Sequence, residues 1–285
     1  MPASPTVSRR LLGAELRALR EERGLTADEA AGRLGWHPSK MSRVETGRSG
    51  LRDAELSRVL DVYEVTEPVA REALSSMSRD GKRRKWWQPY SDVLTKRYSS
   101  FISLESEASS ARSFETTLVP GLLQTPDYAR AVIRALKPQR GADEVNALVD
   151  VRLARQNAAL SRETPLRVWG VVDEAVLHRV VGDGGLMARQ LKRLLTASEQ
   201  PEITLQVLPF GAGAHAGLLG PFVILEFPVR ADLDVVCTEG LTSNVYLERE
   251  EDVAAYSRAF DHVRAAALDV GPSRDLIARR AEDFT

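Results

Sequence analysis

The sequence predicts an α+β protein in which an all-helical N-terminal domain precedes a larger C-terminal domain of mixed α and β structure. Residues 8–79 show apolar side chains at helical spacing, whereas runs of β-branched and aromatic residues begin only near residue 165. The segment RDGKRRKWWQPY, residues 79–90, is basic and contains Gly and Pro. We therefore expect domains at 1–80 and 92–285, joined by a basic linker at 81–91.

The individual elements follow from these patterns. In the first domain we expect a helix from residue 8 that Gly24 ends, a second from Thr26, and further helices at 53–63 and 67–79. The last should face inward at Val69, Ala73 and Met77. In the second domain we expect helices at 92–112, two within 126–162, and others near 185–198, 250–268 and 273–283. Strands are expected at LRVWGVV, ITLQVL, PFVILEF and DVVCTEG.

Composition excludes several classes of protein. The chain has 285 residues, a formal net charge of -1 and one cysteine, Cys237, so it forms neither an intrachain disulfide nor a thiolate metal cluster. No run reaches the roughly 18 apolar residues of a membrane span, so we expect a cytoplasmic protein without membrane contact. Residues 1–85 hold 17 Lys and Arg against 13 Asp and Glu, a formal charge of +4, and the rest of the chain carries -5. A basic N-terminal domain favours a phosphate-bearing partner.

Residues 24–50, GLTADEAAGRLGWHPSKMSRVETGRSG, have the pattern of two helices joined by a tight turn. Thr26 and Glu29 form a potential capping box, Ala30 and Ala31 allow close helix approach, and Gly35 permits the turn. Pro38 suits the first position of the second helix. The outward positions of that helix are then Ser39, Lys40, Ser42 and Arg43, because Met41 and Val44 face inward.

These outward residues are candidates for DNA contact. Arg43 suits bidentate pairing with guanine in the major groove, and Ser39 suits a base edge or a phosphate. Contacts from other basic or polar side chains would be mainly to phosphates. The full candidate set is Thr26, His37, Ser39, Lys40, Ser42, Arg43, Thr46, Arg48 and Arg52. A solvated polar face without DNA contact is the alternative.

Two further expectations concern charge. Glu45 should turn toward a neighbouring Arg such as Arg20, because a carboxylate facing DNA would repel phosphate. In the linker, Lys82, Arg83 and Arg84 are secondary candidates for contact with the DNA backbone, next to two Trp residues.

The N-terminal segment resembles the Xre and phage-repressor type of helix-turn-helix over about residues 9–65. Leu25, Thr26, Ala30, Leu34, Gly35, Ser39, Ser42, Arg43, Glu45 and Gly47 fall on the positions of that signature. The resemblance implies a five-helix domain that binds double-stranded operator DNA, often as a dimer. His37 and Pro38 depart from the pattern, which places more of the expected base reading on Ser39, Lys40 and Arg43.

The C-terminal half lacks a recognisable catalytic pattern. The Gly-rich stretch GAGAHAGLLGP, residues 211–221, precedes a strand and so cannot present a helix N-terminus to a nucleotide. Asp173 and Glu174 are adjacent, and His215 has no second ligand at metal spacing. We expect no metal, no cofactor and no enzymatic activity. The Gly-rich loop could frame a pocket lined by Trp169, Glu174, His215 and Tyr246.

The C-terminal half resembles the C-terminal domain of actinobacterial Xre-type regulators, the WhiJ-like group. The segments VVDEAVLHRVVG, LQVLPFGAGAHAGLLGPFVILEF and EGLTSNVYLE carry this resemblance over about residues 90–280. It implies a developmental regulator whose C-terminal domain has no settled chemistry. We thus expect a homodimeric, sequence-specific transcriptional regulator that senses a ligand or a partner protein. The alternatives are an antitoxin-like protein that binds a small protein encoded nearby, and an enzyme tethered to DNA through the N-terminal domain.

Overall fold

The computed structural model describes residues 7–80, 86–227 and 234–284. The chain divides into two compact units, an N-terminal unit at Met1–Gln88 and a C-terminal unit at Pro89–Thr285. Their secondary structure confirms the predicted α+β class, since the first is helical and the second combines a sheet with helices.

The described part of the N-terminal unit is built from α-helices of about two to four turns, and the short 3₁₀ helix η1 (Gln88–Tyr90) begins at its last residue. Gly24 and Gly35 end the first two helices in the left-handed conformation, both with φ of 66°, which glycine adopts without steric cost. The α-helices are α1 (Val7–Glu22), α2 (Ala27–Leu34), α3 (Pro38–Glu45), α4 (Asp53–Val62) and α5 (Pro68–Asp80).

One core joins all five helices. Leu16, Ala31, Leu34, Met41 and Leu60 are among its fully buried side chains. The predicted inner face of α5 is confirmed at Met77, which packs against this core, but is wrong at Val69 and Ala73. Val69 is 82% exposed and Ala73 is also exposed, whereas Leu74 and Ser78 are buried. Helical spacing alone fits more than one stripe of side chains, and packing against α1 and α4 selects the stripe that contains Leu74.

The C-terminal unit alternates helices and strands along the chain. Its strands are β1 (Ser110–Glu115), β2 (Arg167–Asp173), β3 (Ile203–Leu208), β4 (Phe222–Glu226), β5 (Val235–Glu239) and β6 (Asn244–Leu247). Its α-helices are α6 (Lys96–Glu107), α7 (Pro126–Leu136), α8 (Ala142–Leu160), α9 (Ala175–His178), α10 (Gly184–Ala197), α11 (Glu250–Ala266) and α12 (Val270–Glu282). Two 3₁₀ helices, η2 (Gly121–Leu123) and η3 (Phe210–Ala212), lie between them.

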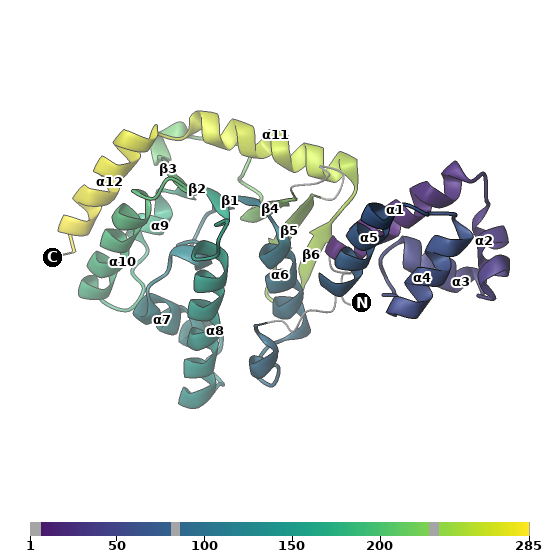
Figure 1. The fold of residues 1–285 in the computed structure, drawn as a ribbon. Helices are drawn as coiled ribbons and strands as arrows, with labels where there is room; N and C mark the ends of the chain where they lie inside the picture. Colours follow the sequence, from purple (N-terminus) through teal and green to yellow (C-terminus); the bar gives the residue numbers. More distant parts are fainter. Residues whose placement is uncertain (1–6, 81–85, 228–233, 285) are drawn as a thin grey trace. The chain divides into compact units, whose positions relative to one another are not determined.

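The strands form one mixed sheet in the order β3-β2-β1-β4-β5-β6. β1, β2 and β3 are parallel, and β1, β4, β5 and β6 pair antiparallel. Helix α11 crosses one face, where its Phe260 and Val263 join a core with Phe114 and Val171. Helices α6, α7, α8 and α10 lie on the other side of the sheet (Figure 1). Side chains that alternate along β1 therefore face two different environments.

The strands expected from the sequence near residues 166, 203, 221 and 234 are all present. The helix expected at 92–112 is wrong beyond Glu107, because residues 110–115 form β1. That strand pairs on one side with β2 and on the other with β4, so ladder hydrogen bonds to distant segments override local helical spacing. Strand β6 and the short helix α9 were not expected.

Two glycines on helices of the N-terminal unit have opposite surroundings. A Cβ added at Gly13 in α1 would lie 2.5 Å from the Glu45 carbonyl oxygen and 2.6 Å from that of Val44. A Cβ at Gly32 in α2 would meet no atom within 4 Å. Gly13 therefore permits the close approach of α1 to the end of α3.

We predict that Gly13→Ala destabilises the N-terminal unit by about 1–3 kcal/mol through overpacking, although alanine is the better helix former. Gly32→Ala is the matched control and should stabilise the unit by up to about 1 kcal/mol. Native-state hydrogen exchange of the α1 and α3 amides measures both changes. Changes of the same sign would contradict the close packing at Gly13.

Candidate functional site

The turn between α2 and α3 is fixed by local hydrogen bonds. Thr26 caps α2: its Oγ1 accepts from the Glu29 amide at 3.2 Å, and its own amide donates to Glu29 Oε2 at 2.8 Å. The Trp36 amide donates to the Ala31 carbonyl at 2.8 Å across the turn. The expected capping box is thus confirmed. Because the Thr26 hydroxyl also donates to Glu29, Thr26 is engaged within the protein.

Helix α3 begins with an unusual cap. His37 is the N-cap residue, and its Nδ1 accepts from the Ser39 amide at 3.2 Å. Pro38 follows at the first helical position. An imidazole nitrogen here takes the place of the Ser or Thr oxygen that usually caps such a helix. His37 and Ser39 are both exposed.

The two faces of α3 differ as expected. Met41 and Val44 are buried, and the Tyr63 hydroxyl donates to Met41 Sδ at 3.7 Å. Ser42 and Arg43 are exposed on the outer face, together with Ser39. Arg43 Nη1 lies 3.4 Å from Ser39 Oγ and donates to it. Thr46 and Arg48, just beyond the helix, are also exposed.

Lys40 does not point away from the protein as expected. Its Nζ lies 2.7 Å from Glu55 Oε1 and 4.2 Å from the centre of the Trp36 ring. Arg52 reaches the same carboxylate at 3.3 Å while remaining 85% exposed. Lys40 and the Arg52 amide and side chain lower the pKa of Glu55 to about 2. The acceptor for Lys40 lies 15 residues ahead in α4, outside the local pattern from which the orientation was predicted.

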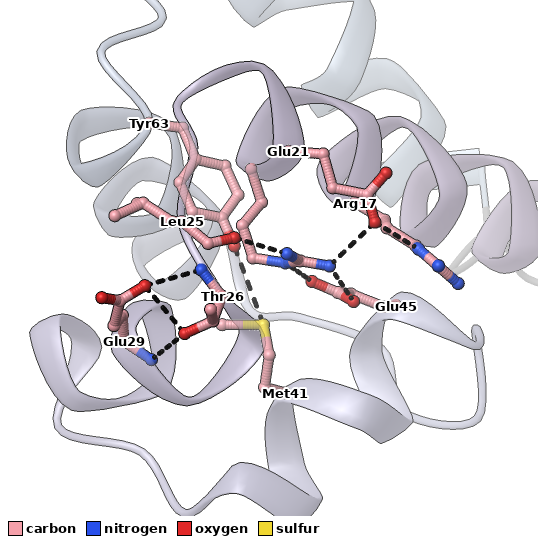
Figure 2. Close-up of polar contacts among 9 residues, drawn as sticks. Arg17, Glu21, Leu25, Thr26, Glu29, Met41, Glu45 and Tyr63 are labelled. Atoms are coloured by element: carbon pink, nitrogen blue, oxygen red, sulfur yellow. Dashed lines mark hydrogen bonds and ion pairs between the residues drawn. The ribbon is translucent and has the colours of Figure 1, made fainter.

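A buried ion pair joins the end of α3 to α1. Arg20 Nε donates to Glu45 Oε1 at 2.6 Å, and Arg20 Nη2 donates to Glu45 Oε2 at 3.2 Å. Arg20 Nη1 also donates to the Leu25 carbonyl at 2.6 Å (Figure 2). Both side chains are less than a tenth exposed. The expected turning of Glu45 toward Arg20 is confirmed, so this carboxylate is held inside the unit.

We predict that Arg20→Gln destabilises the N-terminal unit by about 3 kcal/mol, because it leaves the Glu45 carboxylate buried without its cation. Urea unfolding followed by the exchange of α1 and α3 amides measures the loss. The matched control is Arg17→Gln, which removes an exposed ion pair with Glu21 one turn away on α1 and should leave stability unchanged. Equal effects of the two substitutions would show that burial of the Arg20 pair is unimportant.

The basic residues Lys82, Arg83 and Arg84 of the expected linker lie outside the described residues. Trp86 and Trp87, which follow them, pack edge to face with ring centres 5.4 Å apart.

The pocket expected around the Gly-rich loop stays a prediction, and none of its four residues lines the cavity described below. Trp169 lies against Phe260 of α11 and donates to Gln206 at 2.8 Å. Glu174 accepts from the Phe210 amide at 2.8 Å. His215 Nδ1 accepts from the Gly217 amide at 3.2 Å. The Tyr246 hydroxyl donates to the Arg97 carbonyl at 2.9 Å. Each side chain supports the fold through its own contact.

His215 lies close to a carboxylate. Its Nε2 lies 4.0 Å from Asp173 Oδ2 at the end of β2. Within the described ranges, no cluster of three or more His, Cys, Asp or Glu side chains is arranged to hold a metal ion.

A cavity of about 520 Å³ lies instead on the other face of the sheet. It is bounded by α6, α7 and α8 and by the strands β1, β4 and β5. Its volume is that of a small-molecule site. The polar and charged side chains on its walls are Thr95, Arg97, Tyr98, Glu115, Gln124, Lys137, Arg140, Arg152, Arg155, Glu239 and Asn244.

Comparison with family models gives two matches. Residues 98–279 match the model described as a domain of unknown function (DUF5753). The chain belongs to this family. Residues 11–74 match a model described as a helix-turn-helix domain, and this domain suggests a DNA-binding regulator. No curated protein and no solved structure matches the chain. Across the described parts of the chain, no helix is both long and apolar enough to cross a membrane.

Most of the cavity's lining belongs to the DUF5753 domain, and it includes an acid with a raised pKa. Glu115, the last residue of β1, makes no hydrogen bond or ion pair with another described residue. Burial, followed by the nearby Glu239 carboxylate, raises the pKa of Glu115 to about 8. Arg155 and Arg152 of α8 oppose this rise, and Tyr128 of α7 is a further titratable neighbour. At neutral pH the empty cavity thus holds Glu115 mostly protonated.

We predict that Glu115 makes the DUF5753 domain less stable as pH rises. The native state binds the Glu115 proton up to pH about 8, whereas an unfolded glutamate releases it near 4.5. Stability should therefore fall between these two values and level off above pH 8, by an amount on the order of a few kcal/mol.

Glu115→Gln lacks this titration, so the difference in unfolding free energy between variant and wild type should grow from pH 5 to pH 8. Urea titrations of both proteins across this pH range measure this difference in unfolding free energy. Contributions from the helix-turn-helix domain are the same in both proteins and cancel. Parallel pH profiles would contradict the raised pKa.

Sequence reasoning missed Glu115, Arg152 and Arg155 as functional candidates. Glu115 lies after the helix expected at 92–112, in a segment to which no element was assigned. Arg152 and Arg155 lie within the long helix α8, whose polar residues have the pattern of a solvent-exposed face. Arg155 is buried against Glu105 at 2.5 Å, a contact between residues 50 positions apart that the sequence pattern does not show.

Proposed function

We propose that this protein is a sequence-specific transcriptional regulator that binds operator DNA as a homodimer, of the WhiJ-like actinobacterial type. The outer face of α3 is the observation that carries the proposal. Ser39, Ser42 and Arg43 are exposed there, on a helix whose opposite face is buried and whose end is tied to α1. A helix presented in this way suits the major groove.

Under this proposal the exposed residues divide into two groups. Arg43 reads guanine through its guanidinium, with Ser39 and Ser42 contacting neighbouring base edges or phosphates. Thr46, Arg48 and Arg52 contact the backbone, where their contribution depends on salt more than on sequence. Lys40 is a weaker candidate, because it must leave Glu55 to reach a phosphate.

We propose a homodimer because the surface of α3 that can contact bases is small. Helix α3 has only 8 residues, so a single copy reads a few base pairs. Two copies placed in successive major grooves, about 34 Å apart, read two half-sites and multiply specificity.

For the C-terminal domain we propose ligand sensing without catalysis. The support is the cavity of about 520 Å³, whose size suits a small molecule. A small protein partner, as in the antitoxin-like alternative, would bind an extended surface. The cavity therefore favours the sensor, with the protein located in the cytoplasm where the operator is.

We predict that Arg43→Ala flattens the preference of the protein for its own upstream region over unrelated duplexes. Loss of one bidentate guanine contact should cost about 1–3 kcal/mol of discrimination. Arg48→Ala should weaken binding to all duplexes alike and reduce the slope of log affinity against log salt by about 1. Fluorescence anisotropy with both duplexes at several salt concentrations separates the two effects.

Arg17→Gln is the control for both variants, since Arg17 is an exposed arginine on α1 and should change neither specificity nor salt slope. Equal affinity of the wild type for every duplex would refute sequence-specific regulation.

A further inference from the structure

The charges on the cavity walls are separated by sign. The acids stand on the strand side, where Glu115 ends β1 and Glu239 ends β5. Basic side chains stand on the helix side, where Lys137 caps the end of α7, Arg140 follows it and Arg152 lies in α8. The cavity therefore carries carboxyl groups on one wall and cationic groups on the opposite one.

The strand register defines the acidic wall. Phe114 of β1 pairs with Phe222 of β4, and Val223 of β4 pairs with Cys237 of β5. Continuing both ladders places Glu115 and Glu239 on either side of Pro221. Two strand spacings separate them, roughly 9–10 Å between backbones, which leaves room for a ligand group between the two carboxylates.

Glu115 and Arg152 have unused hydrogen-bonding capacity. Glu115 has no partner among the described residues, and Arg152 donates from Nη1 to Gln124 Oε1, leaving its other N–H groups available. No ion pair links these two side chains, although both line the cavity. An acceptor and a donor of opposite charge that face one space without meeting are suited to a ligand that spans them.

Two of the neighbouring arginines are already paired. Arg155 donates to Glu105 at 2.5 and 2.7 Å in a buried pair, and Arg140 lies 3.7 Å from Glu144. Glu115 and Arg152 are therefore among the ionisable groups on the two walls that a ligand can bind, together with Glu239 and Lys137.

Between the two polar walls the lining is apolar. Phe101, Val132, Ile133, Leu148 and Val223 contribute to it. A ligand that fills this space gains from burial of hydrocarbon, while its polar ends fix its orientation.

We infer that the cavity binds a small zwitterion with an apolar body, such as a short apolar peptide, whose ammonium group contacts Glu115 and whose carboxylate contacts Arg152. The inference deepens the sensing role proposed above by naming the chemistry of the ligand. It needs no DNA, so a direct binding measurement tests it independently of operator recognition.

The protonation of Glu115 supports this assignment. Without a ligand, burial and Glu239 hold the pKa of Glu115 at about 8, and an ammonium group beside it would favour the charged carboxylate. Binding of the zwitterion should therefore strengthen from pH 6 to pH 8 as the proton becomes easier to remove.

The test uses calorimetric titration of the full chain with three probes that share one skeleton: leucyl-phenylalanine, its N-acetyl derivative and its C-terminal amide. The free dipeptide should bind at least 10-fold more tightly than either derivative, because each derivative lacks one of the two charges. No binding of the free dipeptide at millimolar concentration, or equal binding of all three probes, would overturn the inference.

Two variants test which side chain binds each charged group of the ligand. Glu115→Gln should weaken the free dipeptide and the amide about 10-fold but leave the N-acetyl derivative unchanged, and it should abolish the gain from pH 6 to pH 8. Arg152→Gln should weaken the free dipeptide and the N-acetyl derivative but not the amide. The controls, Glu163→Gln and Arg167→Gln, alter exposed side chains outside the cavity and should change nothing.

A uniform loss for all three probes in Glu115→Gln would contradict the assignment of the ammonium contact. The comparison of probes on the wild type remains decisive even where a variant folds poorly.

Discussion

The buried pair between Arg20 and Glu45 determines how the N-terminal unit presents α3. Arg20 bonds the Glu45 carboxylate at the end of α3 and the Leu25 carbonyl just before α2. One guanidinium thus connects α1, the entry to α2 and the exit of α3. A buried pair of this kind contributes less to net stability than its breakage costs, so its main effect is to disfavour other arrangements of these helices.

This constraint has a direct electrostatic consequence. Glu45 lies within a helix whose other exposed groups are hydroxyls and a guanidinium, and a free carboxylate there would repel phosphate. Because Arg20 holds Glu45 inward, the outer face retains the positive charge of Arg43. Likewise, Glu55 binds Lys40 and Arg52, which positions α4 but reduces the number of cations free for the backbone. Under the proposed function, the surface that remains favours contact of Arg43 with bases over simple attraction to phosphate.

The parts of the structure that depend on nearby residues could be predicted from the sequence. The cap at Thr26, the turn at Gly35 and the inward Met41 and Val44 follow from spacings of a few residues. Lys40 could not be oriented in this way, because its carboxylate partner lies on another helix. The same limit applied to β1. Its Ser110 pairs with Arg167 of β2, which lies 57 residues later in the chain.

The cavity beside β1 shows the same limit more clearly. Trp169, Glu174, His215 and Tyr246 were selected for their chemistry, but each has a contact that the sequence pattern did not reveal, as Tyr246 has with the Arg97 carbonyl. The cavity instead depends on which face of β1 Glu115 occupies. That face is set by the register with β2 and β4 and by the helices packed on each side, which only the folded chain defines.

The most direct test of the account is an NMR titration of the full chain with its upstream duplex, in which the side-chain Nε–H signals of Arg43 and Arg20 are compared. The account predicts that the Arg43 signal shifts strongly, and more with the specific duplex than with an unrelated one. The Arg20 signal should remain in place, since that side chain is buried with Glu45. An Arg43 signal that does not move on saturation with the duplex would contradict the claim that the outer face of α3 reads DNA.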